Sequence, residues 1–172
     1  MKSEVKQEFT NLKLTQHKFN TKTLNCFLEN KLSSEASVIE LTDAGVDNST
    51  ILTIFNKTKS LKILHLNWNV KINDEMFYKF ANFDQNHFRK LKRLSLVGCS
   101  EALATHGDYP WFTVNIIKKQ FPSLRYVSFA GCDFVNDKML KCIVRKFGDF
   151  LKVRDYYDEA IDCCGKNCCF EN

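Results

Sequence analysis

A short apolar pattern recurs along this chain, and it limits the possible folds more than any other feature of the sequence. Residues 91–99 read L-K-R-L-S-L-V-G-C, with apolar residues at the first, fourth and sixth places and a small cysteine at the ninth. A repeated pattern of this kind buries its apolar face against the next copy, because one copy alone has no core. The same four places are filled by Leu61, Leu64, Leu66 and Asn69, and by Leu124, Val127, Phe129 and Cys132.

Two weaker copies lie at residues 9–17 and 36–44, so the copies begin at positions 9, 36, 61, 91 and 124. The steps between them are 27, 25, 30 and 33 residues. Each copy precedes a stretch with apolar residues at helical spacing. A strand followed by a helix, repeated, implies parallel strands joined by helical crossovers. We therefore predict an α/β fold, a leucine-rich-repeat solenoid with parallel strands on the concave face and helices on the convex face.

Alternation along each strand predicts which side chains face a partner. Leu64 and Leu66 should point into the core, as should their counterparts Leu94 and Leu96 and Val127 and Phe129. Parallel strands lie about 4.8 Å apart, so the outward residues should form rows across the strands. Tyrosine and arginine are enriched among interface hot spots. The predicted partner-binding residues are Ile63, His65 and Asn67, then Arg93 and Ser95, then Tyr126 and Ser128. The longer connection at residues 100–109 is the competing site.

Local signals predict where helices begin and how the domain is bounded. Thr21 or Thr23 suits the first helix start, Asn48 or Ser49 the second, and Pro110 the first position of the fourth. The length of 172 residues and 44% apolar content fit one domain. We expect about five strand–helix units and a degenerate cap within residues 1–162. The cysteine-rich residues 163–172 should form a flexible tail.

Composition favours a binding protein over an enzyme. The sequence has no phosphate-binding glycine loop, no G-x-S-x-G and no H-E-x-x-H, so we expect no enzyme activity and no cofactor. His106 near Asp108 is interpreted as a solvated loop. The net charge of +5 gives a slight preference for anionic partners. Residues 87–93 are basic but include one aromatic besides the histidine, so a nucleic-acid site is not expected.

The chain shows no secretory signal and no apolar run approaching 18 residues, so no membrane association is expected. The first eight residues lack arginine and carry Glu4 and Glu8, so they make a poor mitochondrial presequence. We expect a cytoplasmic protein, with nucleus and mitochondrion left open.

The eight cysteines are expected to be reduced thiols. Cys99 and Cys132 fill the ninth place, and Cys26 and Cys142 are expected in the core. Four thiolates in the tail suggest zinc, but adjacent cysteines fit one tetrahedral site poorly. Acylation is a further alternative, and a flexible tail without metal is preferred. Prenylation is rejected because Glu171 stands where an aliphatic residue is needed. The tail cysteines are Cys163, Cys164, Cys168 and Cys169.

The stretch G-C-D-F-V-N-D-K-M-L at residues 131–140, with Gly98-Cys99, resembles the cysteine-containing leucine-rich repeats of F-box proteins. The likeness covers residues 59–148 well and 9–58 loosely. It implies the substrate-recognition surface of a ubiquitin ligase receptor. No F-box is visible, so a ligase adaptor is expected only if an F-box exists outside this chain. The repeats are also similar to those of mitochondrial distal membrane-arm assembly and ATP synthase coupling-factor-B-like proteins, which implies a scaffold as the alternative function.

Deleting residues 163–172 is expected to shift the melting temperature by less than about 2 °C, because this segment follows the last recognisable unit and has almost no apolar periodicity. Thermal denaturation of the full and shortened chains checks this. A larger drop, or stoichiometric zinc in the purified full chain, would show that the cysteine cluster is structural.

Overall fold

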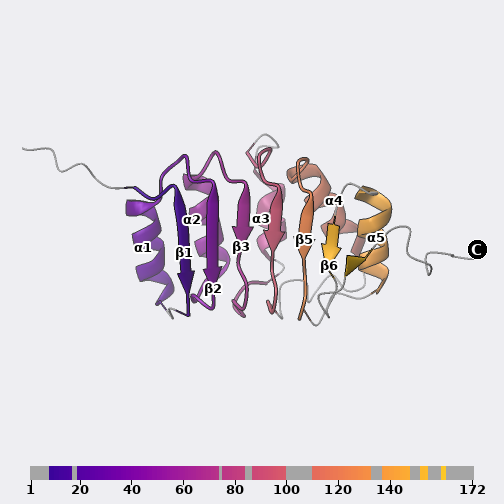
Figure 1. Cartoon of the computed structure of the whole chain (residues 1–172), viewed down its shortest axis with the longest axis horizontal. Coiled ribbons are helices and arrows are strands. Elements are labelled where there is room, and N and C mark those ends of the chain that lie inside the picture. The colour runs from indigo at the N-terminus through magenta and orange to yellow at the C-terminus, as the bar shows by residue number, and fades with distance from the viewer. Residues whose placement is uncertain are drawn as a thin grey trace, which may run out of the picture.

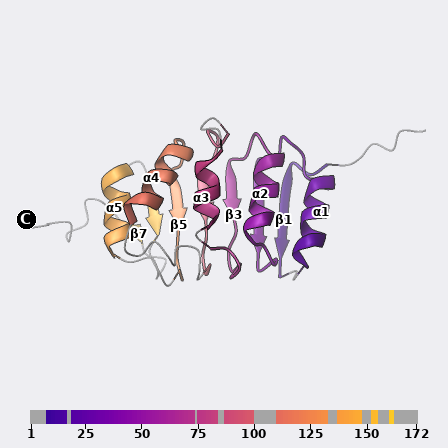
Figure 2. The ribbon, with the colours of Figure 1, turned by 180° about the vertical axis from the view of Figure 1, so that it is seen from behind.

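The computed structural model describes residues 8–16, 19–73, 75–83, 87–99, 110–132, 137–147, 152–154 and 160–161. Strands and helices alternate through the first five units and lie in two layers (Figures 1 and 2). The strands are β1 (Asn11–Thr15), β2 (Val38–Thr42), β3 (Ile63–His65), β4 (Arg93–Ser95), β5 (Tyr126–Ser128), β6 (Lys152–Arg154) and β7 (Ala160–Ile161). The helices are α1 (Thr21–Lys31), α2 (Asn48–Lys57), α3 (Glu75–Ala81), α4 (Pro110–Gln120) and α5 (Asp137–Phe147).

The strands form one sheet whose spatial order follows the sequence, from β1 to β7. Strands β1 to β6 pair in parallel, and β7 alone runs antiparallel, beside β6. All five helices lie on the same face of this sheet (Figure 2). The prediction of an α/β fold with parallel strands joined by helical crossovers is confirmed for β1 to β6. The reversal at β7 was not foreseen.

Helix starts follow local side-chain chemistry, displaced by one residue from the predicted caps in two cases. Asn20 caps α1, where its side-chain oxygen accepts a hydrogen bond from the Lys22 amide at 2.9 Å. Asp47 caps α2, where Oδ1 accepts from the Thr50 amide at 3.0 Å. Asparagine and aspartate satisfy the free amides of a first turn at least as well as threonine does. Pro110 begins α4 as predicted.

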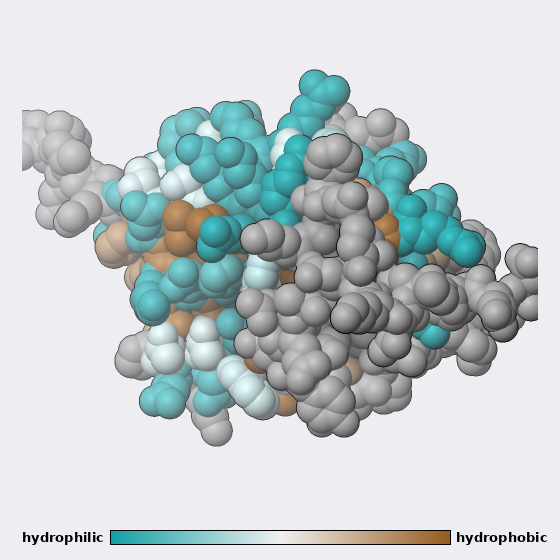
Figure 3. Space-filling view, turned by 45° about the vertical axis from the view of Figure 1, so that its right-hand side comes forward, coloured by the Kyte–Doolittle hydropathy of each residue, from teal (hydrophilic) through white to brown (hydrophobic). Residues whose placement is uncertain are grey.

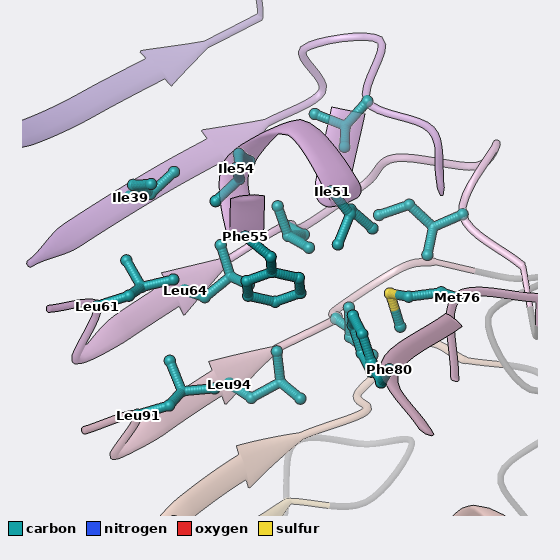
Figure 4. Packing of buried hydrophobic residues seen from close by; sticks show 14 of the residues in the cluster. Ile39, Ile51, Ile54, Phe55, Leu61, Leu64, Met76, Phe80, Leu91 and Leu94 are labelled. Atoms are coloured by element: carbon teal, nitrogen blue, oxygen red, sulfur yellow. The ribbon is translucent and has the colours of Figure 1, made fainter. Parts of the chain in front are cut away.

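The core lies between the two layers and is rich in phenylalanine. All six residues of the predicted inward set are at most 1% exposed, so the inward register is confirmed. Phe55 of α2 meets Phe80 of α3 edge to face at 4.9 Å between ring centroids (Figure 4). Phe80 meets Phe121, which follows α4, at 5.4 Å. These ring contacts tie neighbouring helices to one another above the leucines of the strands.

The turn after each strand has one conformation in all five units. Its eighth place, counted from the start of the repeat pattern, has a positive φ in every unit, whether or not the residue is glycine. Gly98 is required there for a second reason, because a Cβ would lie 2.2 Å from the ring of Trp68. In the first four units, the backbone amide at this place donates to the seventh-place carbonyl of the next unit. The angles are 56° at Gln16, 48° at Asp43, 59° at Trp68, 68° at Gly98 and 67° at Gly131.

The ninth place bonds in the opposite direction, back to the sixth-place carbonyl of the preceding unit. Asn69 is 2% exposed and its Oδ1 also accepts from the amides of Ala44 and Val46, each at 3.0 Å. The predicted role of this place was only to fill the turn. In the three strong copies, its side chain instead links the unit to the one before. The distances are 2.7 Å from Asn69 Nδ2 to Leu41 O, 3.0 Å from Cys99 Sγ to Leu66 O, and 3.0 Å from Cys132 Sγ to Leu96 O.

The cysteines of the described residues are free thiols with different surroundings. Cys99 and Cys132 are buried, and burial raises the pKa of the Cys99 thiol to about 11, which makes it unreactive at neutral pH. Cys142 is half-buried and packs against the core. Cys26 was expected in the core but is exposed, because Leu24 and Leu28 occupy the buried face of α1.

Replacing Asn69 by alanine is expected to lower the free energy of unfolding by about 2–4 kcal/mol, because several buried backbone groups lose their partner together. Urea denaturation measures this. The control is Asn56→Ala at an exposed position of α2, which should not lower stability because alanine is the better helix former. A loss below about 1 kcal/mol for Asn69→Ala would mean that the contact between units does not depend on this side chain.

Candidate functional site

One face of the sheet carries no helix in the described part of the chain (Figure 1). We call this surface the open face. Pairing of β1 to β5 places its outward side chains in two rows across the strands. The first row is Asn11, Val38, Ile63, Arg93 and Tyr126, and the second is Lys13, Glu40, His65, Ser95 and Ser128.

The two rows predicted across β3, β4 and β5 are confirmed. Ile63 pairs with Arg93, and Arg93 pairs with Tyr126. Arg93 is exposed, whereas Ile63 and Tyr126 are half-buried. His65 and Asn67 are also half-buried. The exposed Arg93 therefore lies between two half-buried residues in this row.

Two of the predicted site residues differ from expectation, since Ser95 is 5% exposed and Ser128 is fully buried. Both were expected at the surface. A serine is short, and the longer side chains of the surrounding rows leave it little contact with water. The Ser95 hydroxyl donates to Oδ1 of Asn67 at 2.7 Å. The Ser128 hydroxyl has no hydrogen-bond partner among the described residues. Of the seven predicted site residues, five therefore keep surface on the open face.

A charged group that sequence reasoning missed lies at the N-terminal side of the second row. The Lys13 ammonium is 3.0 Å from Oε2 of Glu40, and Nδ1 of His65 is 3.6 Å from Oε1 of Glu40. The signal was present, because Lys13, Glu40 and His65 occupy the fifth place of their units. The two N-terminal copies are weak matches to the pattern, so their outward residues were not followed across the sheet.

Burial sets the protonation of His65. It lowers the pKa of the imidazole below its ordinary value, and the Glu40 carboxylate opposes this, while Arg93 and Lys13 add to the lowering. His65 is therefore mainly neutral at pH 7, and its contact with Glu40 is not an ion pair there. At 3.6 Å it is also longer than a hydrogen bond. Nε2 of His65 is buried without a partner among the described residues.

The order Glu40, His65, Ser95 on consecutive strands has the residue types of a nucleophilic triad. Nucleophilic catalysis needs a hydrogen bond from the hydroxyl to the base. The Ser95 hydroxyl instead donates to Asn67. Among the residues that the structure describes, no cluster of three or more histidine, cysteine or acidic side chains is placed to hold a metal.

Several sequence predictions fall on residues that the structure does not describe: His106, Asp108, the connection at 100–109 and the tail cysteines. In the basic stretch 87–93, Phe88 is described, and it is 3% exposed within the core. This aromatic ring is therefore not available for stacking on a base.

The stability of the protein should fall as the pH decreases through the ordinary histidine range, partly because of His65. The pKa of His65 is lower in the folded chain than in the unfolded chain. The unfolded chain therefore binds more protons as the pH falls, and this proton binding stabilises it relative to the folded chain. Urea denaturation between about pH 7.5 and about pH 5.5 should show a shallower pH dependence for His65→Gln than for the unaltered chain. In a proton NMR titration, Glu40→Gln should lower the pKa of His65 further. An identical pH dependence for His65→Gln and the unaltered chain would contradict the lowered pKa of His65 in the folded state.

No described helix is long and apolar enough to cross a bilayer. The chain matches no protein-family model, and no curated protein is significantly similar to it.

Proposed function

We propose that this protein is an interaction module, a leucine-rich-repeat solenoid whose open, concave face binds a protein partner. The repetition of one turn conformation in five units supports the solenoid, as do the links between units at the eighth and ninth places. Each unit buries its apolar side against the next, which is how solenoids are stabilised.

The observation that carries the binding role is the row Ile63, Arg93, Tyr126 on the open face. Arginine and tyrosine dominate measured interface hot spots. The half-buried Tyr126 is already partly ordered, so a partner that covers it loses less side-chain entropy than it would on a free side chain. His65, mainly neutral at pH 7 and half-buried, lies beside this row.

The size of the face indicates what the partner must do. Six parallel strands about 4.8 Å apart give a width of about 24 Å, and the strands are short, so the flat area is about 300 Å². A stable interface buries about 800 Å² on each partner. A partner that binds tightly therefore extends past the strands, onto an edge of the sheet or its connections.

The resemblance to F-box repeats supports a substrate-recognition role, in which the partner is a protein destined for ubiquitination. The similarity to mitochondrial assembly factors supports the alternative of a scaffold. Affinity capture with mass spectrometry separates the two, because ligase adaptor and cullin peptides favour the receptor and respiratory-complex subunits favour the scaffold.

The double variant Tyr126→Ala, Arg93→Ala is expected to abolish binding to the captured partner, because it removes both hot-spot side chains of the row. The melting temperature should change by no more than about 4 °C, since neither side chain is fully buried. Calorimetric titration measures the binding.

The matched control is Tyr78→Ala, Arg145→Ala, which removes the same two residue types from exposed positions of α3 and α5. It should bind normally. Unaltered binding by the first variant, with loss on replacing residues 101–108, would move the site to the connection after β4.

A further inference from the structure

The edge of the sheet where the strands begin is strongly basic. Because β1 to β5 are parallel and each is followed by a returning helix, the helices end at the edge where the strands start (Figures 1 and 2). Figure 3 shows hydrophilic side chains along this edge, which lies at the top of the view. We call it the basic edge. Its cations before the strands are Lys59, Lys62, Arg89, Lys90, Lys92 and Arg125.

Three of these cations form a regular row. The Lys92 amide donates to the Lys62 carbonyl at 2.8 Å, and the Arg125 amide donates to the Lys92 carbonyl at 2.9 Å. The three residues thus occupy the same place on neighbouring strands, about 4.8 Å apart. All three side chains are exposed. Like charges on adjacent strands repel one another and lower stability.

The described carboxylates do not neutralise this row. Among the described residues, Lys13 forms an ion pair with Glu40 and Lys79 forms one with Glu75. Two carboxylates do lie at this edge, Glu8 before β1 and Glu35 before β2, and Glu35 accepts a hydrogen bond from the Ser60 hydroxyl at 2.7 Å. Lys90 donates to that same hydroxyl at 3.1 Å. Lys62, Lys92 and Arg125 have no acidic partner in the described part of the chain.

Stabilisation of helix ends explains only some of the positive charge. Lysines in a last turn interact favourably with the helix dipole, as at Lys57 and Lys118. Lys62, Lys92 and Arg125 lie outside the helices, immediately before β3, β4 and β5. The repulsion within such a row of like charges lowers stability, and an anion that lies along the row reduces that repulsion.

We infer that the basic edge binds an extended acidic segment of a protein partner, a run of aspartate or glutamate residues lying across the strand starts. The row from Lys62 to Arg125 spans two strand spacings, about 9.6 Å, which three residues of an extended chain also cover. Arg93 and Tyr126 directly follow Lys92 and Arg125, so this segment continues onto the open face. The inference rests on the proposed function and names the chemistry of its partner.

An acidic peptide fits this edge better than single-stranded nucleic acid does. Proteins that bind single strands place aromatic platforms among their cations. Phe88, within the basic stretch, is in the core, and the exposed Trp68 follows the end of β3, at the opposite edge. A stable interface also needs area beyond the strands. The basic edge supplies that area next to the row of Ile63, Arg93 and Tyr126.

The test is a titration of the full chain into a fluorescein-labelled peptide of about ten glutamates, long enough when extended to cross the row. Fluorescence anisotropy reports the affinity. Lys62→Gln, Lys92→Gln is expected to weaken binding at least about tenfold. The matched control is Lys22→Gln, Lys71→Gln, which removes the same charge from exposed residues outside the edge and should weaken binding less than about twofold. Circular dichroism confirms that both variants are folded.

Failure of the peptide to bind, or equal weakening by the two variants, would overturn the inference. The inference would also be overturned if a labelled oligonucleotide of similar length, or phosphatidylserine vesicles, bound more tightly than the glutamate peptide and if Lys62→Gln, Lys92→Gln abolished that binding. The proposed function is tested separately, by the captured partner and the Arg93 and Tyr126 variant. Loss of partner binding in that variant without any peptide binding would reject the acidic segment and retain the interaction face.

Discussion

The structure depends on how each strand–helix unit is joined to the next after its strand. A buried side chain at the ninth place of a unit bonds back to the preceding unit, while the amide before it bonds forward to the following unit. The residue at the eighth place has a positive φ in each of these turns. The strand register, and with it the rows on the open face, is fixed by these contacts.

The open face shows what a parallel sheet needs when helices cover one side only. Most parallel sheets are apolar on both faces because both are covered. Here the outward places carry polar side chains: the Lys13–Glu40 ion pair, His65 and the hydroxyls of Ser95 and Ser128. The hydroxyl of Ser95 is satisfied by Asn67, but that of Ser128 lacks a partner among the described residues. The face is therefore polar without being fully hydrated.

The sequence was sufficient to predict the fold where the repeat is strong. Periodicity alone predicts that Leu64, Leu94 and Val127 point into the core, because each holds the fourth place of its unit and all three are buried. Exposure on the open face was harder to predict. Alternation gives the direction of Ser95 but not the height of its neighbours, and those neighbours determine how much water reaches it.

Features that depend on contacts between distant residues were not predictable. The antiparallel strand β7 has no repeat pattern, and the caps at Asn20 and Asp47 depended on which polar side chain reaches the first free amides. The row of Lys62, Lys92 and Arg125 could have been predicted, because each holds the second place of a strong copy, but only the inward and outward places of the strands were followed.

The common direction of the five helices has a consequence for how fast a partner is found. Each helix is positive at its start and negative at its end, and the lysines at the ends more than offset the negative charge there. The acidic cap Asp47 and the acidic first turn at Glu75 lie at the opposite edge. A molecule with charge separated in this way turns in the field of an approaching anion before the surfaces touch. Its encounters with an acidic partner are therefore oriented, and their rate falls as salt screens the field.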